Sequence, residues 1–300
     1  MKYSNARTRA PLFRRLTGLT IEEFDQLLPA FQAAFDKDVR QRHPRPGQRA
    51  LGGGRKSVLR TVADKLFFIL FYFRHYPTQD VLAFFFGFSQ GQANQWIHRL
   101  TPLVEQALGQ ELQLPERSSA DLAAVLEACD EAEFIIDGTD RPTRRPQDSE
   151  RQRRQYSGKK KRHTKKNLVI TDKASGEVLG LGATQPGSRN DKACADEEGY
   201  TFPQGSTLYQ DCGFQGYTPE GATIKQPTKK PRGGELTSEQ KAANRTISQE
   251  RVGVEHTLAG VKIYQIVSAV FRNIKEGFDD LVMEVACGLF NFCRACRSTT

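Results

Sequence analysis

The spacing of apolar residues changes character along the chain. In the N-terminal third, apolar residues recur at the spacing of a buried helix face. From residue 133, short runs rich in β-branched and aromatic residues alternate with turns, which is typical of strands. The pattern predicts a helical N-terminal part followed by an α/β part.

Polar residues delimit the helices of the N-terminal part. One helix is predicted over 20–35 and a mostly buried one over 58–76. Thr78 can cap a short helix that Gly87 ends, and Ser89 can cap the next one. Two short helices joined by a tight Gly-containing turn match a helix-turn-helix. An ordinary helical hairpin with a polar outer face explains the same residues equally well.

The helix after Ser89 carries polar side chains that suit DNA. Amides of Gln and Asn can pair with adenine edges, and Arg can bind guanine or phosphate. The segment before this module, residues 43–57, is rich in Gly, Pro and Arg and predicts a mobile basic linker. The candidate DNA contacts are Arg99 and three residues that we call the recognition-helix amides, Gln92, Asn94 and Gln95.

The α/β part contains about five predicted strands followed by helices. A long helix is expected over 237–266 and a final helix over 279–296. Cys293 and Cys296 in the final helix form a lone CxxC without a second pair at zinc spacing, so we interpret them as packing residues. The strand-like runs cover residues 132–139, 167–173, 178–185, 207–213 and 222–227.

Two aspartates each end an apolar run. Asp137 follows FII and Asp211 follows LYQ, and a Gly-containing turn comes after each. Ligand sites of α/β sheets lie at the carboxyl ends of strands, where two such carboxylates could converge and would need a metal between them. Taken singly, an Asp after a strand is more often a turn residue that bonds its own backbone.

A third acid would come from the long helix, where Glu250 and Glu255 are the candidates. At about 100° per residue, Arg251, Glu255 and Lys262 fall within an arc of roughly 60°, together with Ser248. Glu250 lies close to the opposite face. Such a stripe could bind a metal and adjacent phosphates, but a solvated stripe with an Arg–Glu pair explains it as well.

The net charge of the chain favours one kind of partner without deciding it. The chain has 44 Lys and Arg against 35 Asp and Glu, a net charge of +9, which favours a polyanionic partner, with nucleic acid first. The charge could also serve solubility alone. No apolar run approaches the roughly 18 residues of a membrane span, and the basic N-terminus lacks the apolar core of a secretory signal. Six cysteines do not make a disulfide framework, so we expect a reduced, cytoplasmic protein associated with the nucleoid.

The positive charge is concentrated between Arg141 and Lys166. This basic tract holds twelve Lys or Arg and two acids, and it separates two predicted strands that flank Asp137. We expect it to follow a DNA backbone, although charged runs are often solvated loops. His163 could contact phosphate or lie on the surface. The predicted phosphate contacts, which we call the hairpin cations, are Lys159, Lys160, Lys161 and Arg162.

Several motifs in order resemble the insertion-sequence transposases of the DDE class, in the "insertion sequence five" branch related to Harbinger elements. They are FIIDGTDRPTRRP, YSGKKKRHTKKNLVITD, GSRND, LYQDCGFQGY and NRTISQERVGVEHTLAGVK. The family signature is Tyr, two residues, Arg, three residues, Glu, six residues, Lys. Arg251, Glu255 and Lys262 keep its spacing, whereas Ser248 stands at the tyrosine position.

The resemblance implies an RNase H-like catalytic domain with a mixed sheet at 130–300, after a helix-turn-helix module at 58–115 and an N-terminal helix and linker at 1–57. It implies a DNA transposase in which Asp137 bridges two Mg²⁺ or Mn²⁺ ions, and Asp211 and Glu255 bind one each. The partners expected are double-stranded DNA and a second copy of the chain. Alternatives are a catalytically silent DNA-binding regulator and a stand-alone metal-dependent endonuclease.

Overall fold

The computed structural model describes residues 1–42, 57–231 and 233–298, and its chain divides into two compact units. The linker predicted at 43–57 lies outside the described residues except for Ser57. Unit 1 comprises Met1–Leu114, Lys262–Ala269 and Glu276–Thr300, and unit 2 comprises Pro115–Val261 and Val270–Lys275.

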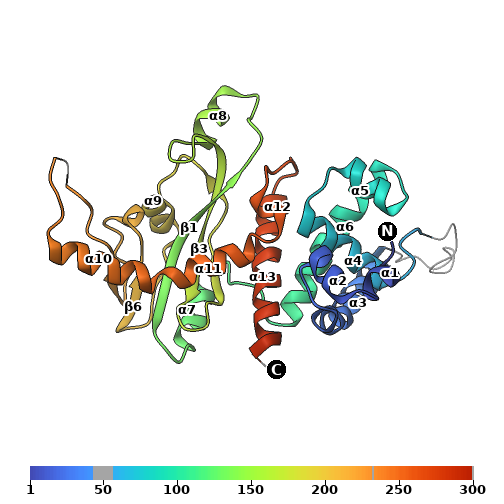
Figure 1. Cartoon of the computed structure of the whole chain (residues 1–300), viewed down its shortest axis with the longest axis horizontal. Coiled ribbons are helices and arrows are strands. Elements are labelled where there is room, and N and C mark those ends of the chain that lie inside the picture. The colour runs from blue at the N-terminus through green and yellow to red at the C-terminus, as the bar shows by residue number, and fades with distance from the viewer. Residues whose placement is uncertain (43–56, 232, 299–300) are drawn as a thin grey trace. The chain divides into compact units, whose positions relative to one another are not determined.

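Unit 1 is all-helical (Figure 1). Within the described residues, no helix of the chain is both long and apolar enough to cross a bilayer. The helices of unit 1 are α1 (Tyr3–Arg7), α2 (Ala10–Thr17), α3 (Ile21–Arg42), α4 (Val62–His75), α5 (Gln79–Phe86), α6 (Gln90–Gln110), α12 (Gln265–Ser268) and α13 (Phe278–Ser298).

Two of the predicted caps begin helices as expected. The Thr78 hydroxyl accepts a hydrogen bond from a backbone N–H in the first turn of α5, and Ser89 forms a reciprocal capping box with Gln92 on α6. α3 runs to Arg42 rather than ending near residue 35. Its last turns are held by Asp38, whose carboxylate pairs with Arg42 within the helix and with Arg99 of α6.

Aromatic side chains fill the core of unit 1. Phe68 of α4 packs edge-on against Phe86 of α5, with ring centroids 5.0 Å apart. α6 lies against α3, α4, α5 and α13. Cys293 is buried in α13, and burial raises the pKa of its thiol to about 12, in keeping with a packing role.

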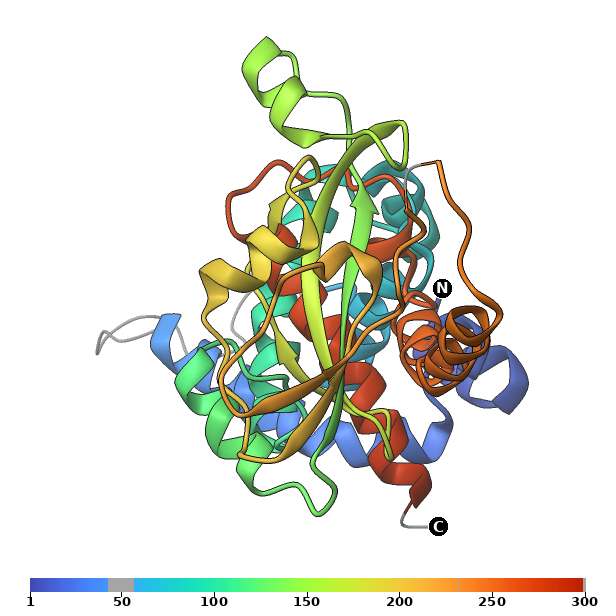
Figure 2. The same ribbon diagram turned by 90° about the vertical axis from the view of Figure 1, so that its left-hand side faces the viewer.

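Unit 2 is built on a twisted mixed sheet (Figure 2). Its strands are β1 (Glu133–Pro142), β2 (Tyr156–Ser157), β3 (Arg162–Asp172), β4 (Val178–Leu181), β5 (Gln185–Pro186), β6 (Ser206–Tyr209) and β7 (Ala222–Lys225). Its helices are α7 (Ser119–Glu127), α8 (Ser149–Gln155), α9 (Asp191–Glu198), the 3-10 helix η1 (Cys212–Phe214), α10 (Ser238–Glu250) and α11 (Val252–Val261).

The main strands lie in the order β4-β3-β1-β6-β7. β1, β6 and β7 are parallel to one another, and β3 runs antiparallel between β1 and β4. All five predicted strands are present, and β2 and β5 add short pairings to β3. The predicted fold class, a mixed α/β domain of RNase H-like type with an all-α part before it in the chain, is confirmed.

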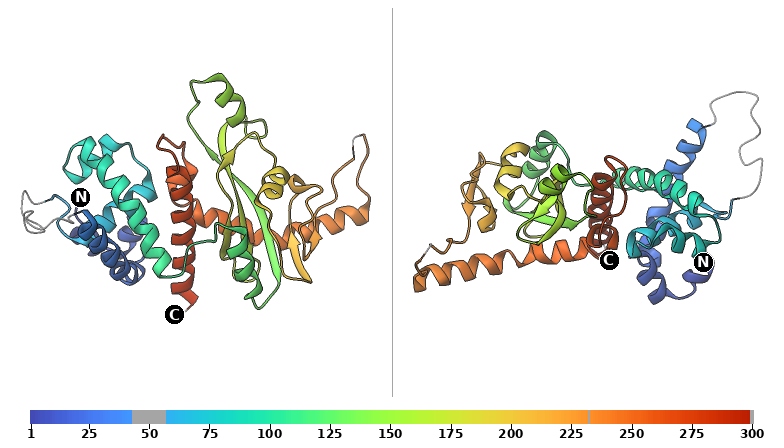
Figure 3. Two further views of the ribbon diagram at one scale, coloured as in Figure 1. Left: turned by 180° about the vertical axis from the view of Figure 1, so that it is seen from behind. Right: turned by 90° about the horizontal axis from the view of Figure 1, so that it is seen from above.

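The predicted long helix is interrupted. α10 ends at Glu250 and α11 starts at Val252, with Arg251 in a turn between them, and α11 ends before Lys262. The two helices still follow one another along nearly one line (orange in Figure 3). The final helix α13 belongs to the compact unit of the N-terminal helices, whereas the sequence places it in the range 130–300. Compact units follow contacts, so the ranges 1–57, 58–115 and 130–300 stay predictions about functional modules.

Candidate active site

The strand register brings Asp137 and Asp211 to the same level. The parallel pairing of β1 with β6 ends at Ile135 and Tyr209, and each aspartate lies two residues beyond that last pair. Neighbouring strands run about 4.8 Å apart. The two carboxylates therefore start from adjacent backbone segments, just beyond the point where the pairing of β1 with β6 ends.

The expectation that Asp137 ends its strand was wrong. β1 continues to Pro142, because its other edge stays paired with β3 as far as the contact of Pro142 with Thr164. Gly138, which resembles a turn residue in the sequence, is therefore a strand residue. β1 thus extends beyond its pairing with β6, and Asp137 lies in the middle of a long strand.

Asp211 is fixed by the turn that follows β6. It caps the 3-10 helix η1, and its Oδ1 accepts a hydrogen bond of 2.6 Å from the backbone N–H of Gly213. This local bond is the turn role that a single Asp after a strand commonly has. The same bond holds the carboxylate beside Asp137, so the structural and chemical roles of Asp211 are compatible.

Asp137 is half-buried, with 21% of its side chain exposed, and two further carboxylates lie near its own. The pKa of its carboxyl is raised to about 6, chiefly by burial and in smaller part by the nearby negative charges of Asp211 and Asp191. The guanidinium of Arg251 opposes this rise, with its Nη2 3.5 Å from Oδ1 of Asp137, and so does the backbone N–H of Gly138. Asp137 would therefore ionise more readily if a cation lay beside it.

Asp191 is a third carboxylate at this place, and the sequence did not single it out. It is the first residue of α9, after the cap Asn190. Its Oδ1 lies 2.6 Å from Nζ of Lys166, which also donates a hydrogen bond to the backbone oxygen of Arg189. The motif GSRND resembles an ordinary helix start, so the sequence offered only a weak signal for this residue.

The two glutamates of the long helical segment differ in their surroundings. Glu250 forms an ion pair of 2.6 Å with Lys173. Glu255 is exposed and lies four residues after Arg251, about one helical turn further along the same side. Lys262 follows the end of α11 and belongs to unit 1, so it does not continue a single helical stripe with Arg251 and Glu255.

The donor chemistry at Asp137 and Asp211 fits a hard divalent cation. Among the residues that the structure describes, no group of three His, Cys, Asp or Glu side chains is close enough to hold a metal ion. The carboxylates of Asp137 in β1 and of Asp211 just after β6, with further negative charge near Asp137, nonetheless form an oxygen-only donor pair. Mg²⁺ and Mn²⁺ prefer such ligands over nitrogen or sulfur.

The predicted DNA-contacting residues of α6 lie near its N-terminus. Gln92 and Gln95 are exposed, Asn94 is half-buried, and the Gln92 side chain also accepts the capping hydrogen bond from Ser89. Arg99 is half-buried, with its Nη2 2.6 Å from Oδ2 of Asp38. The exposed amides are thus available on one end of α6, whereas Arg99 is already paired.

Nine of the twelve cations of the basic tract are exposed, Lys165 is half-buried, and the remaining two are buried. Arg141 donates a hydrogen bond of 2.7 Å to Asn167 inside the sheet, and Lys166 is buried beside Asp191. The His163 ring packs edge-on against Tyr156, with centroids 5.6 Å apart. The hairpin cations are all exposed, at the turn between β2 and β3 and at the start of β3.

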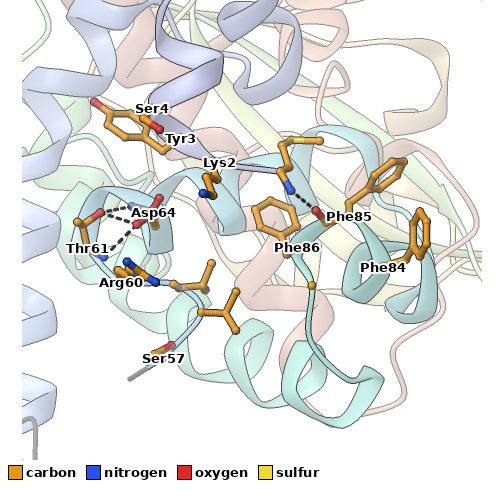
Figure 4. A pocket seen from close by; sticks show the side chains of 14 residues that line it. Lys2, Tyr3, Ser4, Ser57, Arg60, Thr61, Asp64, Phe84, Phe85 and Phe86 are labelled. Atoms are coloured by element: carbon orange, nitrogen blue, oxygen red, sulfur yellow. Dashed lines mark hydrogen bonds between the residues drawn. The ribbon is translucent and has the colours of Figure 1, made fainter. Parts of the chain in front are cut away.

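A pocket of about 600 Å³ lies in unit 1, apart from these carboxylates (Figure 4). Phe84, Phe85 and Phe86 of α5 line it together with Tyr3 and the capping box of Thr61. The pocket contains none of the residues predicted to bind metal or DNA.

Comparison with known proteins identifies related chains. A family model described as DDE superfamily endonuclease matches residues 136–291, which is more than half of the chain. A second model, the helix-turn-helix of DDE superfamily endonucleases, matches residues 57–110, which confirms the helix-turn-helix interpretation of α5 and α6. No solved structure matches the chain.

Two curated relatives cover most of the chain. A protein of Microchaete diplosiphon, named as a transposase for insertion sequence element IS702, is 25% identical over 93% of both chains. A protein of Streptomyces albus G, named as a transposase for insertion sequence element IS112, is 28% identical over 74% of this chain and 77% of its own.

Proposed function

Because the chain belongs to the DDE superfamily of endonucleases, we propose that it is a DNA transposase which binds the ends of a mobile element, cuts them and joins them to target DNA. The observation that carries the proposal is the strand register, which brings Asp137 and Asp211 together where β1 and β6 part. The names of the two relatives, both of which refer to transposition of insertion sequences, support the choice of reaction.

Asp137, Asp211 and Glu255 would hold two Mg²⁺ or Mn²⁺ ions. Bound there, the ions would activate the attacking oxygen and stabilise the leaving oxygen at phosphorus. Asp137 would supply charge from a fixed strand position, and Asp211 would do so from the turn after β6. Glu255, exposed on α11, would complete the set by turning its side chain toward them. Arg251, now 3.5 Å from Asp137, would be released to bind a DNA phosphate.

DNA would be bound at two places on the chain. The recognition-helix amides are proposed to read base edges of the element's ends, as the second helix of a helix-turn-helix does. The hairpin cations and His163 are proposed to bind phosphates close to the sheet that carries Asp137. Lys262 is proposed to bind phosphate as well, and Arg99 would do so only after leaving Asp38. Two copies of the chain would hold the two ends together.

The test is a cleavage assay on labelled duplexes that carry the inverted repeats flanking the gene. With Mg²⁺, the wild-type chain should cut at the repeat ends and leave a 3′ hydroxyl, which should then join to a second duplex. A scrambled duplex should be cut much less, and EDTA should stop the reaction. Binding to the ends without any cutting would leave the DNA-binding regulator as the function, and cutting without joining would leave the stand-alone endonuclease.

A further inference from the structure

We propose that Asp191 is a positioning residue, whose carboxylate is wedged between the β1 backbone next to Asp137 and the turn that carries Asp211, and fixes the spacing of these two aspartates. The inference rests on the proposed function in that it treats these two aspartates as metal ligands. It assigns to Asp191 a role toward its neighbours' backbone rather than toward the metal or the DNA.

The first contact of the wedge is with the residue after Asp137. A β-carbon placed on Gly138 would lie 2.5 Å from Oδ1 of Asp191 and 3.0 Å from its Cγ. Such distances are far below the ordinary van der Waals separation of about 3.5 Å. Gly138 is not in the left-handed region, so the need for glycine here comes from the close approach of Asp191 and not from backbone strain.

The second contact is with the turn after Asp211. A β-carbon on Gly213 would lie 2.4 Å from Oδ2 of Asp191 and 2.8 Å from Oδ1 of Asp211. Gly213 is also the donor of the backbone hydrogen bond that holds Asp211. Each oxygen of the Asp191 carboxylate therefore faces one glycine: Gly138 follows Asp137 in β1, and Gly213 lies in the turn that holds Asp211.

The position of the Asp191 carboxylate is fixed by Lys166 and by the helix cap Asn190. Lys166 is buried on β3 and pairs with Asp191 at 2.6 Å, while the same ammonium donates 2.8 Å to the backbone oxygen of Arg189. Asn190 caps α9 through the N–H of Ala193 and so fixes the backbone before Asp191. The carboxylate therefore cannot swing away cheaply, because doing so would leave a buried ammonium unpaired.

This arrangement explains why a carboxylate stands beside two others. Lys166 offsets part of the negative charge of Asp191 on the side of β3, so its carboxylate contributes shape to the site in addition to charge. An uncharged residue of the same size would keep the shape and lose the anchor. A small residue would lose both and would let the turn of Asp211 shift relative to the β1 backbone at Asp137.

The experiment is a double-mutant cycle read by Mn²⁺ affinity, measured on the full chain without DNA. Gly138→Ala and Asp191→Ala should each weaken Mn²⁺ binding by about 10- to 100-fold, the usual range for residues that position metal ligands. In the Asp191→Ala background, Gly138→Ala should cause little further loss, because the atoms it collides with are gone. In the Asp191→Asn background, the penalty of Gly138→Ala should persist.

A matched control lies on the same helix. Asp196 is exposed on α9 and pairs with Lys192. Asp196→Asn should leave Mn²⁺ affinity unchanged. Circular dichroism should show the wild-type spectrum for each variant, and if Asp191→Ala does not fold, Asp191→Asn and Gly138→Ala still test the claim, since each alone should weaken Mn²⁺ binding.

The outcomes separate this inference from the proposed function. Wild-type Mn²⁺ affinity in Asp191→Asn and Gly138→Ala would overturn the positioning role. Losses from Gly138→Ala and Asp191→Ala that simply multiply would overturn it too, because a wedge requires the second loss to vanish. If the cycle behaves as expected but the wild type cuts no DNA, the wedge stands and the transposase function falls.

Discussion

Asp137 should make the metal-free protein less stable as the pH rises, and replacing it with Asn should remove that loss. Its pKa is raised from an ordinary value of 3.8 to about 6 in the folded chain. A carboxyl with a raised folded pKa holds its proton more tightly when folded, so stability falls as pH rises through the interval between the two values. Asp137→Asn mimics the protonated form at every pH.

The size of the effect follows from the pKa. A difference of one pKa unit between the folded and the unfolded chain corresponds to about 1.36 kcal/mol. The penalty on the wild type is therefore at most about 3 kcal/mol at pH 8, where the carboxyl is ionised in both states. At pH 4.5 it has shrunk to about 1 kcal/mol, because the folded carboxyl is protonated there. This sum already contains the attraction to Arg251.

The assay is chemical unfolding of wild type and Asp137→Asn in EDTA at both pH values. The variant should be more stable at pH 8, and its advantage should fall by about 2 kcal/mol at pH 4.5. Mg²⁺ at pH 8 should stabilise the wild type and have little effect on the variant, because a cation replaces the missing counter-charge. A variant that is less stable at pH 8, or an advantage independent of pH, would refute the electrostatic account of this site.

Two further predictions concern DNA. Changing the recognition-helix amides together to Ala should weaken binding to element ends far more than to random DNA in a gel-shift titration, and equal losses on both would show that α6 does not read bases. Changing the hairpin cations together to Ala should flatten the slope of log K against log salt by up to about 3 to 4 units, similarly for end and random DNA. An unchanged slope would mean that these charges face only water.

Local signals in the sequence predicted the helix starts well, and distant contacts explain where they failed. Thr78 and Ser89 cap helices through bonds to the next few residues, so the sequence contains all the information needed. The end of α3 depends on Asp38 and its partner Arg99, 61 residues away. The same partnership withdraws Arg99 from the surface on which the sequence placed it.

At the candidate site too, local features could be predicted from the sequence, whereas contacts between distant residues could not. An apolar run before Asp137 and before Asp211 marked the two strands, but not the pairing with β3 that extends β1 past Gly138. Asp191 gave no comparable signal, because its role depends on the close approach of α9 to two glycines distant in sequence. Counting charges in the basic tract likewise could not show that Lys166 turns inward to Asp191.

The central claim, that three particular acids serve catalysis, is tested most directly by comparing acid-to-amide variants in Mg²⁺-dependent cleavage of labelled element ends. Asp137→Asn, Asp211→Asn and Glu255→Gln should each abolish cutting while DNA affinity survives. Glu250→Gln, whose carboxylate pairs with Lys173 instead, should keep most of the activity. Full cutting by any of the first three, or loss of DNA binding in all of them, would contradict the assignment.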